Sequence, residues 1–447
     1  MQLSLEENKN NLISEISKFF DKDFIEHLAQ ETGFVQRESK LQGLEFFLLC
    51  VFAHQKSPSM SLDGLCGELI SNNVIISKQS LQDRFNERSV EFMHQLVGEV
   101  LLKKLTNQQA VIKTNFKRII IGDSTVFQLP EAFEYKYRGS GGGASSSAIK
   151  IQYQFDLLTH EIVALVNQEG TRPDCKFQPE DLQANDLRLE DLGYYKLDRL
   201  KQINQAGAFF VSRFKFGIKA YVEKPKYYEE LDFSKIIRTL KVNQIKSIQV
   251  YLGDKEMFPV RLIIEKVPKK IADEKRRKLK TDKQIKRKNI SQERLAFCDM
   301  NVYITNTDEQ QLSAEKVKQC YGLRWQIEII FKAWKSIFHL DQVKPMRIER
   351  FECLHYGRLI LIILSTNLFQ YFRQLFYAKS NQELSELKAF RAIVRVFIEK
   401  YNSFVRSKYS FEGAITNMLK IIEKTCIKDQ KRNKLKPLTI LNYLSLT

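Results

Sequence analysis

The chain reads Arg118-Ile-Ile-Ile-Gly-Asp-Ser-Thr125 at the point where its hydrophobic pattern first changes. A short apolar run that is rich in β-branched residues is typical of a buried strand. Two more strands are predicted, by the polar–apolar alternation of residues 149–155 and by the apolar run within residues 161–166. Three strands in succession predict a sheet at the centre of the fold.

Helical patterns lie on both sides of this strand-rich region. Apolar residues recur with a helical period from the start of the chain to about residue 112, and again from Ser313 to the end. A helix is also expected over residues 192–205, after which residues 208–307 return to short strands. We therefore expect an α/β protein in which helical domains flank a core that a β-rich segment interrupts.

The size and charge of the chain narrow the class of protein. At 447 residues it exceeds what one hydrophobic core usually organises, so two or three domains are expected. Lys and Arg number 71 against 53 Asp and Glu, which leaves a net charge of +18. Such a cationic excess favours polyanionic partners, so nucleic acid is expected first and an anionic membrane surface second.

The cysteines and the apolar runs predict a cytoplasmic protein. The seven cysteines include no Cys-x-x-Cys pair, and their odd number argues against a disulfide framework. The first residues lack the basic and then apolar layout of a signal peptide, and the longest apolar run, residues 359–364, is too short to span a bilayer. We expect a soluble protein in a reducing cytosol.

A helix-turn-helix pattern is predicted near the N-terminus. Residues 61–70 suggest one helix, residues 71–73 a turn, and Ser77 the N-cap of a second helix. The second helix would carry side chains of the types that read DNA bases, namely Lys78, Gln79, Gln82, Arg84 and Asn86. Because helical hairpins with polar faces are common, DNA reading and plain helical packing both stay open.

Two polar segments invite a functional interpretation. Residues 139–147 are rich in Gly and Ser like a phosphate cradle, but they lack the Gly-Lys-Ser/Thr ending of a nucleotide-binding loop, so we interpret them as a flexible loop. Residues 266–288 carry 12 Lys or Arg. That density is typical of a solvated, partly disordered loop, and with the net charge of the chain it also favours an arm that binds the DNA backbone.

The sharpest local pattern is a set of four polar residues, Tyr321, Arg324, Glu328 and Lys335, in a stretch that favours helix. At about 100° of rotation per residue, all four fall within about 60° on the helical wheel. One acid, two cations and a phenol on one face suit a site where a carboxylate holds a metal ion while its neighbours hold phosphate oxygens. The same spacing also fits a solvated face with Glu–Lys pairs.

Two aspartates complete an acidic set. Asp123 comes at the carboxyl end of the first predicted strand, where ligands and metal ions gather in open α/β sheets. A lone aspartate there is more often a turn or cap residue unless a second acid faces it, and Glu328 supplies that acid. Asp191 follows a short alternation in the same way, with Asp186 and Asp198 as the rival choices for the third acid.

These residues together resemble the insertion-sequence transposases of the "IS four" group. The last acid of that family lies in a Tyr-x2-Arg-x3-Glu-x6-Lys signature, and Tyr321, Arg324, Glu328 and Lys335 match all four positions. The first acid of the family looks like Asp123 in Gly-Asp-Ser-Thr, and the second like Asp191 in Asp-Leu-Gly-Tyr. The resemblance also covers the layout of nearly the whole chain.

The resemblance implies a division into domains. Residues 113–207 and 315–375 would form a ribonuclease-H-like catalytic core, and residues 208–314 a β-rich insertion beside the active site. Residues 1–112 would form a helical DNA-binding domain, and residues 376–447 a basic helical C-terminal domain.

The resemblance also implies a mechanism. Two Mg²⁺ ions, with Mn²⁺ tolerated, would be held by Asp123, Asp191 and Glu328 during cleavage of element ends and strand transfer, without a covalent link between protein and DNA. Tyr321, Arg324 and Lys335 would bind DNA phosphates. The partners would be double-stranded DNA, as terminal repeats and as target, and a second copy of the chain in a homodimer on DNA associated with the nucleoid.

One departure and two alternatives accompany this interpretation. Better-known relatives have a Trp in the insertion that receives a flipped base, whereas the two tryptophans here are Trp325 and Trp334, so Phe297 or Tyr303 could stack instead. A tyrosine recombinase would need a nucleophilic Tyr with several Arg and His, and the six His are scattered. A catalytically silent, domesticated DNA-binding relative is the other alternative.

Overall fold

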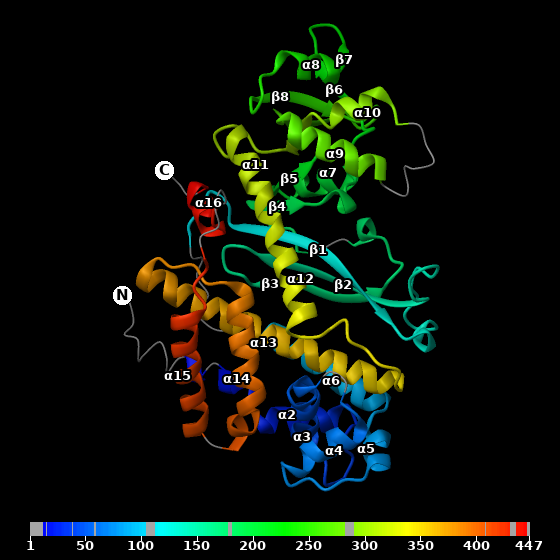
Figure 1. Ribbon diagram of the computed structural model, residues 1–447, viewed down its shortest axis with the longest axis vertical. Helices are drawn as coiled ribbons and strands as arrows, with labels where there is room; N and C mark the ends of the chain where they lie inside the picture. Colours follow the sequence, from blue (N-terminus) through cyan, green and yellow to red (C-terminus); the bar gives the residue numbers. More distant parts are fainter. Residues whose placement is uncertain are drawn as a thin grey trace.

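The computed structural model describes residues 12–444 except residues 15, 38, 58–59, 104–111, 178–180, 282–289, 407 and 430–434. A ten-stranded sheet runs through the molecule in the order β3-β2-β1-β4-β5-β10-β9-β8-β6-β7. Helices from both ends of the chain gather at one end of the molecule, and the insertion forms the other (Figure 1). The predicted α/β class is confirmed.

Five strands form the part of the sheet that carries two of the predicted acids. They are β1 (Arg118–Leu129), β2 (Ser147–Asp156), β3 (Ile162–Glu169), β4 (Asp186–Glu190) and β5 (Phe209–Arg213). Strands β3, β2 and β1 pair antiparallel, whereas β4 and β5 continue from β1 as parallel strands. Three antiparallel strands followed by parallel ones form the mixed sheet of a ribonuclease-H-like core.

The insertion extends this sheet. Its strands are β6 (Ala220–Glu223), β7 (Tyr228–Glu230), β8 (Ile245–Leu252), β9 (Phe258–Lys266) and β10 (Met300–Thr305), and its helices are α8 (Phe233–Thr239), α9 (Lys269–Thr281) and α10 (Gln292–Phe297). Strand β10 returns to pair antiparallel with β5. The insertion has its own hydrophobic cluster, which includes Phe210, Leu252 and Ile304.

The N-terminal region is helical, as predicted. Its elements are η1 (Lys18–Phe20), α2 (Lys22–Glu31), α3 (Gly43–Val51), η2 (Ala53–Lys56), α4 (Leu62–Ile70), α5 (Lys78–Arg84) and α6 (Glu87–Leu102). Ser61 and Ser77 cap α4 and α5 with their side chains. The expectation that the second helix runs through Asn86 is wrong, because Asn86 forms a capping box with Ser89 and starts α6 instead.

The remaining helices pack around the core. They are α7 (Leu197–Gln205), α11 (Ala314–Gly322), α12 (Gln326–Ser336), α13 (Ile348–Ser380), α14 (Glu386–Arg406), α15 (Lys408–Thr425) and α16 (Pro437–Tyr443), with short 3₁₀ turns η3 (Glu131–Phe133), η4 (Asp174–Lys176), η5 (Leu192–Tyr194) and η6 (Leu323–Trp325). Helix α12 crosses the sheet, and α13 contacts α3, α6 and α14 (Figure 1). Helix α13 thus joins the N-terminal and C-terminal helices.

Helix α13 passes the length and composition test for a membrane span. Its mean hydropathy over the most apolar window is 1.3, and 83% of that window is buried inside the protein. The apolar run at residues 359–364 therefore contributes to the core. Burial of this kind is typical of a central helix in a folded domain.

The first strand is longer than predicted. The sequence predicts a short strand that ends before Asp123, but β1 continues to Leu129 because β2 pairs with it along residues 120–129. Asp123 thus lies within the strand, and its predicted place at the end of β1 is wrong. The Gly-rich residues 139–146 form a loop that leads into β2, as predicted, with Gly141 and Gly142 at positive φ.

The basic segment 266–288 is partly helical. The expectation of a solvated loop is wrong for α9, because this helix rests on the start of β10. Lys275 donates to the Met300 carbonyl (2.8 Å), and Arg276 pairs with Asp299 (2.6 Å). Residues 282–289 of the segment lie outside the described residues.

The predicted domain boundaries stay a prediction. The sheet continues from β5 to β10 on the two sides of the predicted insertion boundary at residue 208. Helix α13 runs without a break past residue 375, where the C-terminal domain is predicted to begin.

Close backbone packing between α13 and α3 generates a stability prediction. A Cβ atom built on Gly357 would lie 2.6 Å from the Cys50 carbonyl carbon and 3.1 Å from the Val51 nitrogen. We expect Gly357→Ala to lower the free energy of unfolding by about 1–3 kcal/mol, since the two backbones must separate. Chemical denaturation would measure the change.

A second helical glycine provides the control. Gly98 lies inside α6, and a Cβ there would meet no atom within 4 Å. Gly98→Ala should raise the free energy of unfolding by about 0.5–1 kcal/mol through its better helix propensity. Equal effects of the two substitutions would contradict the packing argument.

Candidate active site

Asp123 is placed where the neighbouring strand stops. Strand β4 pairs with β1 through Ile121, and β1 continues beyond that point with β2 as its partner. Asp123 therefore lies level with the carboxyl end of β4, although it is not at the end of its own strand. The Ser124 amide donates to Asp123 Oδ1 (2.8 Å) and holds the carboxylate.

Asp191 follows β4 directly, as predicted. It is the N-cap of η5, and its Oδ2 accepts from the Gly193 amide (3.5 Å). The rival Asp186 is fully buried and pairs with Arg118 (2.5 Å), while Asp198 is exposed in the first turn of α7. Of the three aspartates, Asp191 is the one that the ion pairs of the described residues bring to Arg324.

Glu328 is positioned by aromatic packing of its helix. Trp334 of α12 is 1% exposed and makes an edge contact with Tyr153 of β2 (5.0 Å between ring centroids). Phe331 packs on the same tyrosine (6.4 Å). Because Tyr153 lies opposite Asp123 in the β1–β2 register, this packing holds α12 against the strand that carries the first acid.

The Arg324 guanidinium joins the three acids. Its Nη1 lies 3.0 Å from Asp123 Oδ2, its Nη2 3.3 Å from Glu328 Oε1, and its Nε 3.5 Å from Asp191 Oδ1. The first two contacts are hydrogen bonds, and the third is an ion pair whose geometry leaves Nε without a hydrogen bond. Three carboxylates from β1, the end of β4 and α12 thus share one cation.

The charged groups of this cluster shift the pKa of Asp123 and of Arg324. Burial raises the pKa of Asp123, and the nearby carboxylates of Asp191 and Asp174 act in the same direction, against the Ser124 amide and Arg324. Burial works to lower the pKa of Arg324, but the surrounding acids and Tyr321 raise it overall. The guanidinium therefore stays charged and offsets repulsion between the acids.

Tyr321 contacts the acid cluster through Asp191. Its hydroxyl donates to Asp191 Oδ1 (3.4 Å), and its ring lies against Tyr303 of β10 (5.3 Å between centroids). The side chain is 6% exposed. Burial, with Asp191 nearby, raises the pKa of Tyr321 to about 12. The phenol is thus a neutral hydrogen-bond donor fixed between the insertion and the core.

Lys335 lies next to the cluster and not within it. A hollow of about 560 Å³ is lined by Thr125, Glu328, Phe331, Lys332, Lys335, Ser336 and Asp341. Both lysines are exposed, and Lys335 Nζ lies 5.7 Å from the centre of the Phe127 ring. The hollow joins Glu328 to two cations, an arrangement that suits an anionic group beside the acids.

The donor set fits a divalent cation. Among the described residues no three acidic or imidazole side chains are grouped closely enough to hold a metal ion as they stand. Arg324 lies among Asp123, Asp191 and Glu328, however, and all three carboxylates reach it. Carboxylate oxygens are the ligands that Mg²⁺ and Ca²⁺ prefer. The acids can therefore serve a metal site once the guanidinium moves aside.

Sequence patterns gave no role to two residues that the structure places close to the acid-bearing residues. Asp174 lies in a connecting segment outside every pattern, and its Oδ1 accepts from Ser124 Oγ (2.8 Å). Trp325, beside Arg324, is 60% exposed, whereas Tyr303 is buried and Phe297 packs against Phe214 within the insertion. Its place directly after Arg324 in the signature is the sequence signal that could have singled out Trp325.

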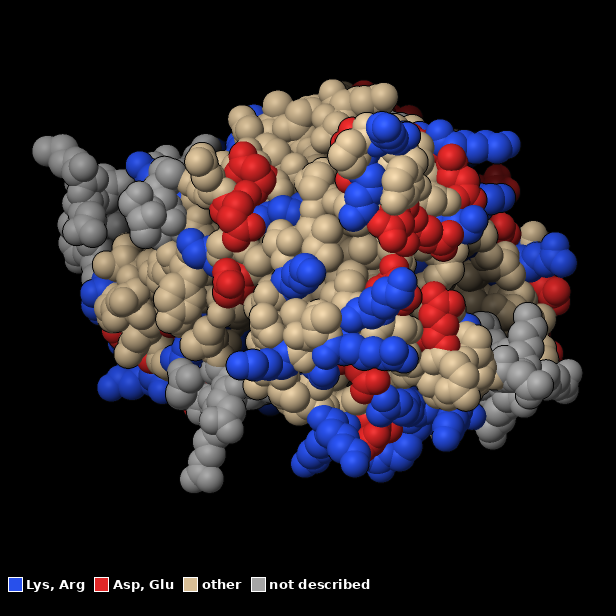
Figure 2. Space-filling view, turned by 90° about the horizontal axis from the view of Figure 1, so that it is seen from above, with Lys and Arg blue, Asp and Glu red and all other residues tan. Residues whose placement is uncertain are grey.

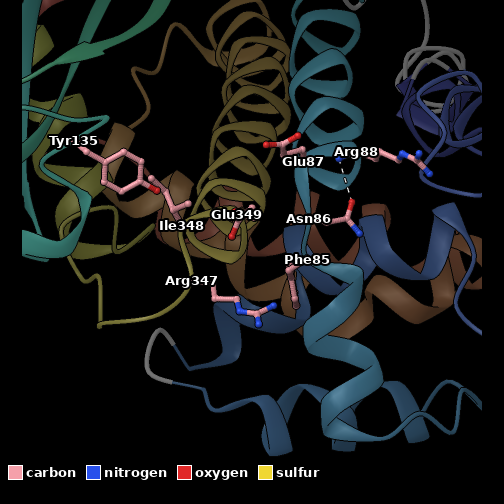
Figure 3. Close-up of a pocket in the computed structure, with 8 residues that line it drawn as sticks. All are labelled: Phe85, Asn86, Glu87, Arg88, Tyr135, Arg347, Ile348 and Glu349. Atoms are coloured by element: carbon pink, nitrogen blue, oxygen red, sulfur yellow. Dashed lines mark hydrogen bonds between the residues drawn. The ribbon is translucent and has the colours of Figure 1, made fainter.

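A larger hollow lies away from the acids. It measures about 730 Å³ and is lined by Phe85, Asn86, Glu87, Arg88, Tyr135, Arg347, Ile348 and Glu349 (Figure 3). It opens where the end of α5, the start of α6 and the start of α13 meet. Its charged residues are two arginines and two glutamates, so charge alone does not favour an anion there.

Comparison with known proteins identifies a family whose match includes these acids. The family described as "Transposase DDE domain" matches residues 114–364, which span β1 to α13. The transposase for insertion sequence element IS1151 of Clostridium perfringens is 33% identical over 461 residues, covering 97% of this chain and 96% of that protein. The transposase for insertion sequence element IS231F of Bacillus thuringiensis subsp. israelensis is 30% identical over 455 residues, covering 97% and 95%.

Among solved structures, the chain matches the cryo-EM structure of the piggyBac transposase synaptic complex with hairpin DNA. It has a TM-score of 0.42 and 14% sequence identity, and the match covers 95% of this chain and 88% of that one. The family match, in contrast, covers more than half of the chain and includes all three converging acids. The chain belongs to the DDE transposase family and is a DNA-cleaving and DNA-joining enzyme of DNA transposition.

Proposed function

We propose that the chain cuts the ends of an insertion element and joins them to target DNA through Asp123, Asp191 and Glu328. The observation that carries the proposal is the shared contact of these three carboxylates with Arg324, at 3.0 to 3.5 Å. Side chains that all reach one cation can also reach a common metal ion. Metal-assisted phosphoryl transfer needs this arrangement of oxygen ligands.

We infer that the metal is Mg²⁺, bound as two ions, with Mn²⁺ as a substitute. When bound, the two ions activate the attacking oxygen and stabilise the leaving oxygen of an in-line displacement at a phosphodiester. Arg324 gives up its contacts with the acids in this state. Its planar guanidinium then suits a bidentate contact with a phosphate of the DNA.

DNA phosphates beside the acids would be held by Arg324, Tyr321 and Lys335. Lys332, which lines the same hollow as Lys335 and Glu328, adds a further cation. Trp325 would stack on an unpaired base next to the cleavage site, because its ring is exposed and it follows Arg324 directly in the chain. This role replaces the one that the sequence suggests for Phe297 or Tyr303.

Chemistry without a covalent protein–DNA link agrees with the state of Tyr321. Its hydroxyl is buried and donates to Asp191, and a raised pKa disfavours the phenolate that a nucleophile would need. This supports the transposase over a tyrosine recombinase. The convergence of the acids likewise supports an active enzyme over a domesticated DNA-binding relative.

Two surfaces would contact DNA away from the acids. The exposed basic residues of α9 are Lys269, Lys270, Arg277, Lys278 and Lys280. Figure 2 shows Lys and Arg gathered toward its lower edge. The predicted DNA-binding domain, residues 1–112, offers α5 as the helix that would enter the major groove.

We also propose that the chain acts as a homodimer on DNA in the cytoplasm. A homodimer on DNA would bring two element ends together, with residues 376–447 as the contact between copies. The protein would act in the cytoplasm at the nucleoid, where its double-stranded DNA substrate lies.

Loss of a metal ligand should abolish cleavage. We expect Glu328→Gln to lower the rate of nicking at terminal repeats on the order of 10³-fold, since a metal contributes several kcal/mol to the transition state. Binding to the repeats should remain. Gel analysis of a labelled duplex in Mg²⁺ would measure both.

The matched control is Glu315→Gln, an exposed acid in the first turn of α11. It should cleave like the native protein. Nicking by Glu328→Gln at the native rate would refute the triad.

Removal of the shared cation should make the protein sensitive to metal. Without DNA, Arg324→Gln leaves three carboxylates facing one another, so binding of Mg²⁺ relieves more repulsion than in the native protein. We expect about 5 mM Mg²⁺ to raise the melting temperature of this variant by about 2–4 °C more than that of the native protein.

Arg213→Gln is the control, because Arg213 lies over the Tyr321 ring at 5.5 Å, and in the described part of the chain the ion pairs of the three acids are with Arg324. Its response to Mg²⁺ should equal the native response. The same shift in all three proteins would count against the acids as a metal site.

The exposed face of α9 should contribute to the salt dependence of DNA binding. Replacing Arg277, Lys278 and Lys280 by Gln should reduce the slope of log K against log salt by up to about three, because each phosphate contact releases about one counterion. Fluorescence anisotropy at several KCl concentrations would measure the slope.

A matched triple variant changes Lys235, Arg238 and Lys241 to Gln, which are exposed in α8 or just after it in the same insertion. It alters the net charge equally. If both variants reduce the slope equally, net charge and not the α9 surface is responsible.

A further inference from the structure

Asp174 is the centre of a hydrogen-bond network on the core sheet. Its Oδ1 accepts from Ser124 Oγ (2.8 Å), Lys150 Nζ (3.0 Å) and Gln152 Nε2 (3.0 Å). The donors belong to β1 and β2, while Asp174 itself belongs to η4, in the segment between β3 and β4. One carboxylate oxygen thus ties a connecting segment to two neighbouring strands.

The network lies on the opposite face of the sheet from the acids. Successive side chains of a strand alternate between the two faces, and Ser124 pairs with Gln152 just as Asp123 pairs with Tyr153. Tyr153 faces α12, where it contacts Trp334. The Asp174 network therefore supports β1 from behind, directly under the residue that carries the first acid.

One branch of the network leads to Asp123. Ser124 donates to Asp174 through its hydroxyl and to Asp123 Oδ1 through its amide (2.8 Å). The same residue thus bonds both carboxylates. A Ser124 held by Asp174 fixes the peptide that orients Asp123.

A second branch leads to Asp191. Gln152 donates to Asp174 and accepts from the Tyr194 hydroxyl (2.5 Å). Tyr194 is buried in η5, the turn that Asp191 caps. A Cβ built on Gly193 in this turn would lie 3.7 Å from Asp174 Oδ2 and 3.9 Å from Asp191 Oδ2, so the two carboxylates flank the same glycine.

The charge of Asp174 is balanced within the network. The Lys150 side chain is 9% exposed, and its ammonium pairs with Asp174 and donates to the Arg172 carbonyl (2.6 Å). A buried ammonium with a carboxylate partner holds its position more firmly than an exposed pair, because its alternatives in the interior are few. Asp174 is therefore fixed from three directions.

We propose that Asp174 is a positioning residue that sets the placement of Asp123 and Asp191 for divalent metal ions. The inference rests on the proposed function of these two aspartates. Residues behind metal ligands orient them, and loss of such residues typically weakens metal binding or activity by about 10–100-fold. No contact between Asp174 and the metal is required.

Metal binding by the DNA-free protein tests the proposal. Mn²⁺ is titrated into the full-length native protein and the Asp174→Ala variant, with free Mn²⁺ followed by electron paramagnetic resonance. We expect the variant to bind Mn²⁺ about 10–100-fold more weakly. Half-maximal cleavage should likewise require about 10–100-fold more Mg²⁺, while binding of terminal-repeat DNA in EDTA stays within about twofold.

Asp174→Asn separates positioning from charge. It keeps an acceptor oxygen for the three donors and removes the negative charge. Mn²⁺ affinity within about threefold of native supports a role through hydrogen bonds. Affinity as weak as that of Asp174→Ala would overturn that role. If the alanine variant does not fold, the asparagine variant and Ser124→Ala, which removes the link to β1, carry the test.

A matched acid in the same segment gives the control. Asp181 pairs with Arg118 (2.5 Å) at the far end of β1 and is 46% exposed. Asp181→Ala should leave Mn²⁺ affinity unchanged even if it lowers the melting temperature. If Asp174→Ala lowers the melting temperature but leaves Mn²⁺ affinity at the native value, Asp174 is a structural residue and the proposal fails.

Failure of the inference is distinct from failure of the proposed function. If the native protein neither binds Mn²⁺ nor cleaves DNA, the proposed function itself fails, and with it the role of Asp174. If the native protein does both and Asp174→Ala does both equally well, the triad stands and Asp174 has no positioning role.

Discussion

Arg324 holds together three carboxylates that come from three separate parts of the fold. Asp123, Asp191 and Glu328 repel one another at short range, so their convergence needs a positive charge among them. In the absence of metal the guanidinium supplies that charge. The same residue type suits a phosphate, so an exchange of partners by Arg324 would couple entry of the metal ions to arrival of DNA.

The surrounding strands and helices bring these side chains to one point. Parallel pairing puts the end of β4 beside the middle of β1, which sets two acids side by side. Aromatic contacts of Trp334 and Phe331 with Tyr153 then hold α12 over the same strand. The insertion contributes as well, because Tyr303 of β10 packs against Tyr321. The long insertion thus supports α11, which carries Tyr321, through its returning strand β10.

Strand β1 carries a polar network on each of its two faces. The face toward α12 carries the acids and their counter-ion. The other face carries Asp174 with its donors from β1 and β2, covered by the segment between β3 and β4. Buried polar groups are costly unless each finds a partner, and here Lys150 and Gln152 both find one in Asp174. The strand is therefore held on both faces at the position where the chemistry is proposed.

Local sequence determined much of this protein. The change of hydrophobic period before β1 and the caps Ser61 and Ser77 depend on short-range patterns, and the corresponding elements begin where they were expected. The single helix expected around Glu328 is wrong, because the 3₁₀ turn η6 separates α11 from α12. Tertiary structure alone decided the extension of β1 through Asp123, because pairing with β2 is a long-range effect. It also docked α9 on β10 and brought Asp174 to Ser124, since contacts between distant segments leave no periodic signal in the chain.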